Sequence, residues 1–256
     1  MSPGETAVDV ATARRLVSMM DLTSLNEGDD SAAVERLAKL AVSPAGRVAA
    51  LCIWPRFIGV ARAALCGCTV PVAAVTNFPD GTAGPEAAAA ETAAAVGAGA
   101  DEVDLVFPYP ALLAGDSEAG AVLMRLCRAA CGTRLLKVIL ETGQLATPEL
   151  IRRAADLAID GGADFLKTST GKTQPGVTPA AVSVLLDAIE AARGRGRSVG
   201  LKVSGGIRSG SSARSWLERY ESRFGAGSAT PATFRIGASS LLTELRAVLE
   251  SGSLSG

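Results

Sequence analysis

Short apolar runs alternate with longer amphipathic stretches along this chain of 256 residues. The short runs are rich in β-branched and other apolar residues, and the longer ones are rich in Ala, Leu, Arg and Glu at helical spacing. The runs predict eight strands, at residues 19–24, 48–54, 70–78, 102–108, 134–141, 165–170, 199–206 and 234–239. The clearest helices are predicted at residues 85–96, 117–130, 148–159, 179–192, 211–223 and 241–250, with an additional one before the first strand at residues 7–18.

Eight strand–helix units in a chain of this length are typical of a (β/α)8 TIM barrel, an α/β fold. We therefore expect residues 1–256 to form one barrel domain, with a helical extension over about residues 1–18 and a disordered tail over about residues 251–256. A doubly wound open sheet is the alternative. It would usually place a glycine-rich loop after the first strand, where this chain has Ser-Leu-Asn-Glu at residues 24–27.

Composition excludes several kinds of chemistry. Hydrophobic residues make up 48% of the chain and charged residues 20%, which is enough to build a large core. The formal net charge of -1 argues against a nucleic-acid partner. The chain contains no histidine, which excludes a Ser-His-Asp triad and a His-ligated metal site. We expect no metal and no cofactor, and acid–base chemistry by Asp, Glu, Lys, Cys, Tyr or water.

The cysteines and the N-terminal segment indicate the cellular setting. Five cysteines without a C-x-x-C pair fit neither a disulfide framework nor a zinc site. The first ten residues lack the apolar segment of a signal peptide, and no apolar run reaches membrane-spanning length. These patterns predict a cytoplasmic protein without a membrane partner.

Most of the few lysines fall in predicted strands. The chain has 5 lysines among its 25 cationic residues, and Lys137, Lys167 and Lys202 lie within the fifth, sixth and seventh strands. Side chains alternate between the two faces of a strand, and each of these lysines follows a leucine that would face outward. The three lysines, together with Asp104 of the fourth strand, are therefore predicted to point into the barrel.

Such a buried cluster has two interpretations. Lysines paired with Asp104 and Glu141 could form an inert polar layer, and we expect Lys137 to pair with Glu141 because the two are close in sequence. Alternatively, crowded lysines lower one another's pKa, and a neutral amine forms a Schiff base with a carbonyl compound. Barrel interiors are normally filled with Val, Ile and Leu, so the second interpretation explains the charges better. Alternation alone leaves open whether Lys167 or Lys202 is the nucleophile.

Glycines and hydroxyls follow the last strands of the predicted barrel. Residues 204–210 read Ser-Gly-Gly-Ile-Arg-Ser-Gly, and residues 237–240 read Gly-Ala-Ser-Ser before the final helix. In TIM barrels the loops after strands seven and eight commonly bind phosphate through backbone N–H groups. Gly171 and Lys172, after the sixth strand, add a nearby cation. These loops predict a phosphorylated sugar or a similar carbonyl compound as substrate.

Several long motifs resemble the family of 2-deoxyribose-5-phosphate aldolases. They are DEVDLVFPY at residues 101–109, FLKTSTGK at 165–172, KVSGGIR at 202–208 and RIGASS at 235–240. Shorter matches are DLT at 21–23, CIWPRF at 52–57, VTNFP at 75–79 and KVILETG at 137–143. The resemblance extends from Asp21 to Leu242, nearly the whole chain.

The resemblance implies a class I aldolase without a metal. It would reversibly cleave 2-deoxy-D-ribose 5-phosphate to acetaldehyde and D-glyceraldehyde 3-phosphate. It also implies that Lys167 is the Schiff-base lysine, that Lys202 lowers its pKa, and that Asp104 is the acid–base carboxylate. The other matched residues are Asp21 and Lys137 in the supporting polar network, Thr23 and Cys52 near the aldehyde, and Gly171, Lys172, Gly205, Gly206, Gly237, Ser239 and Ser240 at the phosphate.

Other assignments fit the same residues less closely. They are a different Schiff-base aldolase or transaldolase acting on a phosphorylated sugar, a pyridoxal-phosphate enzyme, and a phosphate-sugar binding barrel without catalysis. Some members of the family also end in a tyrosine thought to move the enamine proton, and this chain has no tyrosine after Tyr220. The family often forms dimers, so a homodimer is expected.

Overall fold

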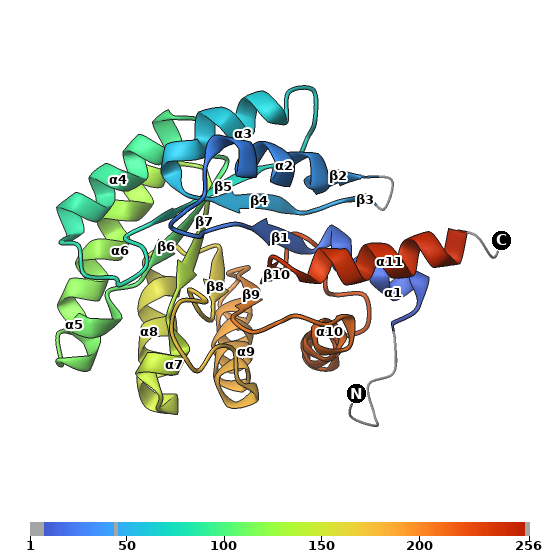
Figure 1. Cartoon of the computed structure of the whole chain (residues 1–256). Helices are drawn as coiled ribbons and strands as arrows, with labels where there is room; N and C mark the ends of the chain where they lie inside the picture. Colours follow the sequence, from blue (N-terminus) through green and yellow to red (C-terminus); the bar gives the residue numbers. More distant parts are fainter. Residues whose placement is uncertain (1–7, 44–45, 254–256) are drawn as a thin grey trace.

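Eight parallel strands form a closed barrel in the computed structural model, which describes residues 8–43 and 46–253 (Figure 1). The predicted (β/α)8 fold is confirmed. The barrel strands are β1 (Met20–Thr23), β4 (Ala50–Ile53), β5 (Val72–Thr76), β6 (Glu102–Val106), β7 (Leu135–Ile139), β8 (Phe165–Lys167), β9 (Gly200–Ser204) and β10 (Phe234–Ala238). A separate antiparallel pair is formed by β2 (Val42–Ser43) and β3 (Gly46–Arg47).

Helices surround the barrel on its outer face (Figure 1). They are α1 (Val10–Ser18), α2 (Ser31–Ala41), α3 (Ile58–Ala64), α4 (Pro85–Gly97), α5 (Tyr109–Leu113), α6 (Ser117–Cys131), α7 (Thr142–Leu145), α8 (Pro148–Asp160), α9 (Pro179–Gly194), α10 (Gly210–Phe224) and α11 (Leu241–Ser253), with a 3-10 turn, η1, at Pro55–Phe57. No helix in the described residues is both long and apolar enough to cross a bilayer.

Both ends of the predicted helical layer differ from expectation. Helix α1 begins at Val10, and Ala7, the expected first residue, lies outside the described residues. Helix α11 continues to Ser253, three residues beyond its expected end at Glu250. The predicted disordered tail is therefore wrong for residues 251–253, while residues 254–256 lie outside the described range. In Figure 1, α1 and α11 lie side by side and close the ring of helices.

The barrel interior is divided into an apolar and a charged half. On β4 and β5 the inward side chains include Ala50, Cys52, Ala73 and Val75, which pack together in one apolar cluster with Leu25. The other strands contribute buried charged side chains, which are Asp21, Glu102, Asp104, Lys137, Lys167, Lys202 and Arg235. Because an apolar wall faces these buried charges, loss of hydration strongly affects the pKa of every ionisable group inside the barrel.

The same turn precedes β6 and β8, the strands that carry Asp104 and Lys167. The sequences are Gly-Ala-Asp-Glu-Val-Asp at residues 99–104 and Gly-Ala-Asp-Phe-Leu-Lys at 162–167. Both glycines have a left-handed φ, of 104° and 100°, which strongly favours glycine. Asp101 and Asp164 therefore occupy equivalent positions, one residue before the start of each strand.

Each aspartate is tied at two points to the strand before it. The Asp101 amide donates to the Val72 carbonyl at 2.8 Å, and the Val72 amide donates to the Asp101 carboxylate at 2.9 Å. Asp164 repeats both bonds with Leu136, each at 2.8 Å. These turns fix the starting points of β6 and β8 at the N-terminal end of the barrel.

Candidate active site

A pocket of about 240 Å³ opens at the C-terminal end of the barrel. Lys167 contributes to its lining, and the loops after β1, β8, β9 and β10 form its walls. Of the predicted site residues, the pocket lining includes Thr23, Lys167, Gly171, Lys172, Gly205, Gly206, Gly237, Ser239 and Ser240. The C-terminal end is where TIM-barrel enzymes carry their active sites.

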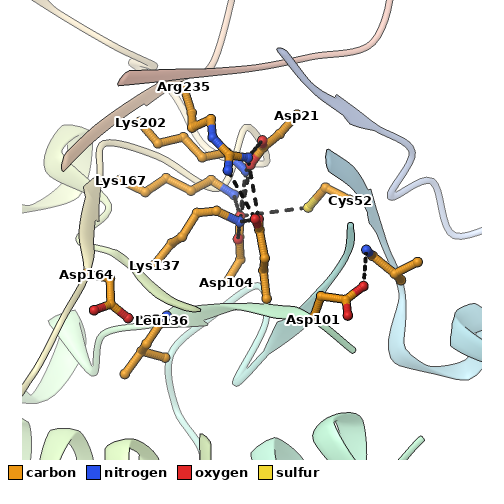
Figure 2. Close-up of polar contacts among 12 residues, drawn as sticks. Asp21, Cys52, Asp101, Asp104, Leu136, Lys137, Asp164, Lys167, Lys202 and Arg235 are labelled. Carbon is orange, nitrogen blue, oxygen red and sulfur yellow. Dashed lines mark hydrogen bonds and ion pairs between the residues drawn. The ribbon is translucent and has the colours of Figure 1, made fainter. Parts of the chain in front are cut away.

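Three lysines converge on one carboxylate beside this pocket (Figure 2). The Asp104 carboxylate accepts from the ammonium groups of Lys137 and Lys167 at 2.8 Å each and from that of Lys202 at 2.7 Å. Strand register explains the convergence, because Asp104 lies opposite Lys137 on β7 and Lys167 lies opposite Lys202 on β9. The inward orientation predicted from alternation is confirmed for all four residues.

Lys167 has fewer anionic partners than the other two lysines. Within residues 8–43 and 46–253, its ammonium nitrogen pairs with Asp104 alone. Lys202 pairs with both Asp104 and Asp21, at 2.7 and 2.5 Å, whereas Lys137 is within 3.2 Å of Asp21, Glu102 and Asp104. Among the three, Lys167 is therefore the least neutralised, and it is also the one that reaches the pocket.

Burial acts on all three lysine pKa values, but the outcome differs. Burial lowers the pKa of Lys167, and although Asp104 opposes this, the nearby Lys202 charge adds to it, so the pKa lies below its usual value. Burial also disfavours the charged forms of Lys137 and Lys202. There the paired carboxylates outweigh it and raise both pKa values. The Asp104 carboxyl is buried too, yet the three lysines hold its pKa well below the usual range.

The predicted ion pair between Lys137 and Glu141 is wrong. Glu141 lies beyond the end of β7 with a left-handed φ of 52°, and its carboxylate accepts from the backbone amide and hydroxyl of Thr170. Lys137 reaches Glu102 at 2.6 Å instead. Glu141 therefore fixes the loop after β8, and burial raises its pKa.

Cys52 and Thr23 lie next to each other on the neighbouring strands β4 and β1. The Cys52 thiol, on β4, donates to Asp104 at 3.7 Å, and burial raises its pKa. It is therefore a neutral thiol directed at the Asp104 carboxylate, from the side away from the lysines (Figure 2). Thr23 lies opposite Cys52 in the strand pairing, and its hydroxyl donates to the Asp21 carbonyl.

The glycine- and serine-rich loops meet beside Lys172. Gly205 and Gly206 have left-handed φ values of 95° and 89°, and Gly205 packs against Gly176. The Lys172 side chain reaches Leu25, another residue of the pocket lining, and its ammonium group donates to the Leu25 carbonyl at 2.6 Å. This arrangement gathers backbone amides, hydroxyls and the cationic side chains of Lys172 and Arg208 around the pocket, which are the groups that bind phosphate.

Three residues near the site were missed in the sequence. Arg235 and Glu102 lie next to the lysine cluster, and each is on the same strand face as a residue that was identified, Gly237 and Asp104 respectively. Alternation was therefore the available signal. Arg208 lines the pocket and stands inside the KVSGGIR motif, but it was not assigned a role. In the described part of the chain, no group of three or more His, Cys, Asp or Glu side chains could hold a metal ion.

Sequence comparison adds a decisive observation to this geometry. The profile of the DeoC/LacD family of aldolases matches residues 15–245. The chain belongs to this family. The aldolase is thus a carbon–carbon lyase, and both the cluster and the pocket lie within the matched residues.

Solved structures agree with the assignment of this aldolase. A protein of Toxoplasma gondii ME49, named as a candidate deoxyribose-phosphate aldolase, is 27% identical over 94% of this chain and 95% of its own, with a TM-score of 0.85. A corresponding protein of Coccidioides immitis is 29% identical over 94% and 88%, with a TM-score of 0.77. The tetrameric deoxyribose phosphate aldolase of Aeropyrum pernix is 26% identical over 95% and 93%, with a TM-score of 0.73.

Proposed function

We propose that this aldolase reversibly cleaves 2-deoxy-D-ribose 5-phosphate to acetaldehyde and D-glyceraldehyde 3-phosphate through a Schiff base on Lys167. The observation that carries the proposal is that Lys167 combines a lowered pKa, a single anionic partner and a position in the pocket. A neutral amine at a pocket floor is a nucleophile for an aldehyde carbonyl. The names of the similar structures support the choice of deoxyribose phosphate.

The reaction begins with attack of the Lys167 amine on the carbonyl of the open-chain sugar. Loss of water from the carbinolamine gives an iminium at C1. Removal of the proton from the C3 hydroxyl then breaks the C2–C3 bond, and the iminium accepts the electron pair of that bond. Glyceraldehyde 3-phosphate leaves, and an enamine of acetaldehyde remains on the lysine. Protonation of the enamine carbon and hydrolysis of the imine release acetaldehyde and restore the amine.

Asp104 is placed to move the protons of this sequence. Its carboxylate touches the Lys167 nitrogen, where the carbinolamine forms, and also touches Lys202. The three lysines hold its pKa well below the usual range, so the carboxylate begins the sequence ionised and able to accept a proton. Lys202 remains charged and repels a proton from Lys167, while Asp21 and Lys137 orient the two partners.

The substrate phosphate is assigned to the wall that contains Lys172. We infer that Gly171, Gly205, Gly206, Gly237, Ser239 and Ser240 supply amides and hydroxyls there, and that Lys172 exchanges its bond to the Leu25 carbonyl for the phosphate. A pocket with the Lys167 amine at one end and the phosphate-binding groups at the other fits an extended phosphorylated sugar. Homodimerisation and a cytoplasmic location stay predictions.

Reductive trapping tests the nucleophile and the small aldehyde together. Incubation with acetaldehyde and borohydride should replace one hydrogen on the Lys167 nitrogen with an ethyl group, located by peptide mapping. The Lys167→Arg variant should lose the adduct, and the exposed Lys39 on α2 serves as the unselective reference within the same digest. An adduct on Lys202 or Lys172 would overturn the assigned roles, and its absence from the folded wild type would favour a binding protein without catalysis.

Replacing Ser239 should separate phosphate binding from chemistry. Ser239→Ala removes one hydroxyl from the phosphate wall, so we expect KM for 2-deoxyribose 5-phosphate to rise about tenfold to a hundredfold, the cost of one hydrogen bond to a charged group. KM for unphosphorylated 2-deoxyribose should change little. Ser222→Ala, at an exposed position on α10, is the matched control. Equal loss with both sugars would place the phosphate elsewhere.

A further inference from the structure

A second layer of buried charge lies against the lysine cluster, on the side away from the pocket. The guanidinium of Arg235, on β10, donates to Asp21 at 2.6 Å and to Glu102 at 3.1 Å. Glu102 in turn pairs with Lys137 at 2.6 Å. Arg235 and Glu102 are each about 95% buried, and neither lines the pocket. Both residues therefore act on the reacting end only through the groups between them and Lys167.

The two layers together are unbalanced in charge. The cationic side chains are Lys137, Lys167, Lys202 and Arg235, and the carboxylates paired with them are Asp21, Glu102 and Asp104. With every group ionised, four cations would face three anions in a buried space. Uncompensated charge in a protein interior is costly, and the usual response is that one group becomes neutral. Release of one proton from one lysine brings the count to three against three.

The pairing pattern selects the lysine that becomes neutral. Arg235 cannot lose its proton in a protein, and both Lys137 and Lys202 contact at least two carboxylates. Lys167 contacts one carboxylate, which it shares with the other two lysines. We propose that Arg235 and Glu102 are positioning residues whose opposite charges set the balance that leaves Lys167 as an uncharged nucleophile.

Charged and titratable groups face Lys167 from most of the surrounding strands. They are Asp104 and Glu102 on β6, Lys137 on β7 with Glu141 after it, Lys202 on β9, Arg235 on β10, Asp21 on β1 and Cys52 on β4. Strand β5 presents Ala73 and Val75, which carry no charge. Cys52 is a neutral thiol, and Glu141 is held by Thr170 outside the ion-pair network. Glu141 also lies within electrostatic reach of Lys167, but burial raises its pKa and disfavours its charged form, so the ion pairs among the four cations and three carboxylates carry the balance.

Two substitutions should change the balance in opposite directions. Arg235→Met removes a cation and leaves Asp21 and Glu102 with unused negative charge, which favours the protonated form of Lys167. Glu102→Gln removes an anion and leaves the cations in greater excess, which favours the neutral form. The pH midpoint for ethylation of Lys167 should therefore rise in the first variant and fall in the second, by about one pH unit each. A purely structural role would not move the midpoint in opposite directions.

The measurement is the rate of Lys167 ethylation by acetaldehyde and cyanoborohydride across a pH series, followed by peptide mass. Exposed Lys39 in the same digest reports the pH dependence of the reagents themselves. Arg235→Lys keeps the charge and should keep the wild-type midpoint. The double variant Arg235→Met/Glu102→Gln loses one charge of each sign and should also return to it. Arg152→Met, on the outer helix α8, is the control for a change in total charge.

The outcomes distinguish this inference from the function on which it rests. No adduct on wild-type Lys167 would reject the proposed Schiff base itself. A wild-type adduct with an unchanged midpoint in Glu102→Gln, a nearly isosteric change, would reject the charge balance while leaving the aldolase mechanism intact. If Arg235→Met does not fold, Glu102→Gln and Arg235→Lys decide the matter alone. A midpoint that moves in the same direction in both single variants would also overturn the proposal.

Discussion

Asp104→Asn should lower the turnover of 2-deoxyribose 5-phosphate by roughly two to four orders of magnitude, the range associated with loss of a general acid–base group. The carboxylate touches the nitrogens of Lys137, Lys167 and Lys202, and a neutral amide cannot accept and return a proton. The variant also leaves the buried lysines with too little negative charge. We therefore expect a further cost in stability of about 3–5 kcal/mol, as for other broken buried ion pairs.

Acetaldehyde release, measured by coupled reduction with an alcohol dehydrogenase, checks this result, and thermal unfolding checks the stability. Asp164→Asn is the matched control, because Asp164 also bonds to an inner strand and to an arginine, but it lies away from the cluster (Figure 2). It should lose stability and retain the chemistry. A folded Asp104→Asn enzyme within about tenfold of the wild-type turnover would mean that another group moves the protons.

Lys202→Met should move the rising limb of the pH–rate profile upward by about 1–3 pH units. In the wild type the Lys202 ammonium lies 2.7 Å from the carboxylate that Lys167 also uses, and its positive charge opposes a second one nearby. Without Lys202, both Asp104 and Asp21 lose a cation, so the protonated form of Lys167 gains stability and its pKa rises. At a fixed pH below both midpoints, the rate falls about tenfold for every pH unit by which the midpoint has risen.

The pH dependence of kcat/KM for the retro-aldol reaction measures this change. Lys202→Arg keeps a positive charge at the same position and should leave the limb close to that of the wild type, although it changes the hydrogen-bond geometry. A limb that stays in place in a folded Lys202→Met enzyme would remove Lys202 from its role. Activity loss with the limb unmoved would point instead to a contact with the substrate.

The sequence indicated whether a strand side chain points into the barrel, but it was less informative about the position of that side chain along the barrel axis. Alternation placed Asp104, Lys137, Lys167 and Lys202 on the inner face because each follows an apolar residue that faces outward. It does not say how far along the barrel axis two inward residues lie from one another. Lys137 and Glu141 are four residues apart, which corresponds to about 13 Å of extended strand, so sharing a face could not make them partners.

The remaining differences also arise from contacts between distant segments. Arg235 and Glu102 were passed over because the lysines alone drew attention, and their pairing joins strands on opposite sides of the barrel. Strand β8 ends at Lys167, three residues earlier than expected, because Thr168 uses its side chain to bond both the amide and the carbonyl of Ser204. No local sequence pattern indicates that a side chain will replace the backbone hydrogen bonds between two strands.

The repeated turns at residues 99–101 and 162–164 make the length of the chain at that end of the barrel a condition for activity. One residue added to or removed from either turn would reverse the facing of every side chain that follows, directing Asp104 or Lys167 toward the helices. The loops around the pocket can change in length without this effect, because each follows a strand whose inward and outward side chains are already determined. During divergence, insertions that alter substrate choice are therefore tolerable in the loops at the C-terminal end of the barrel. The two turns at the N-terminal end must keep their residue count as well as their glycine and aspartate.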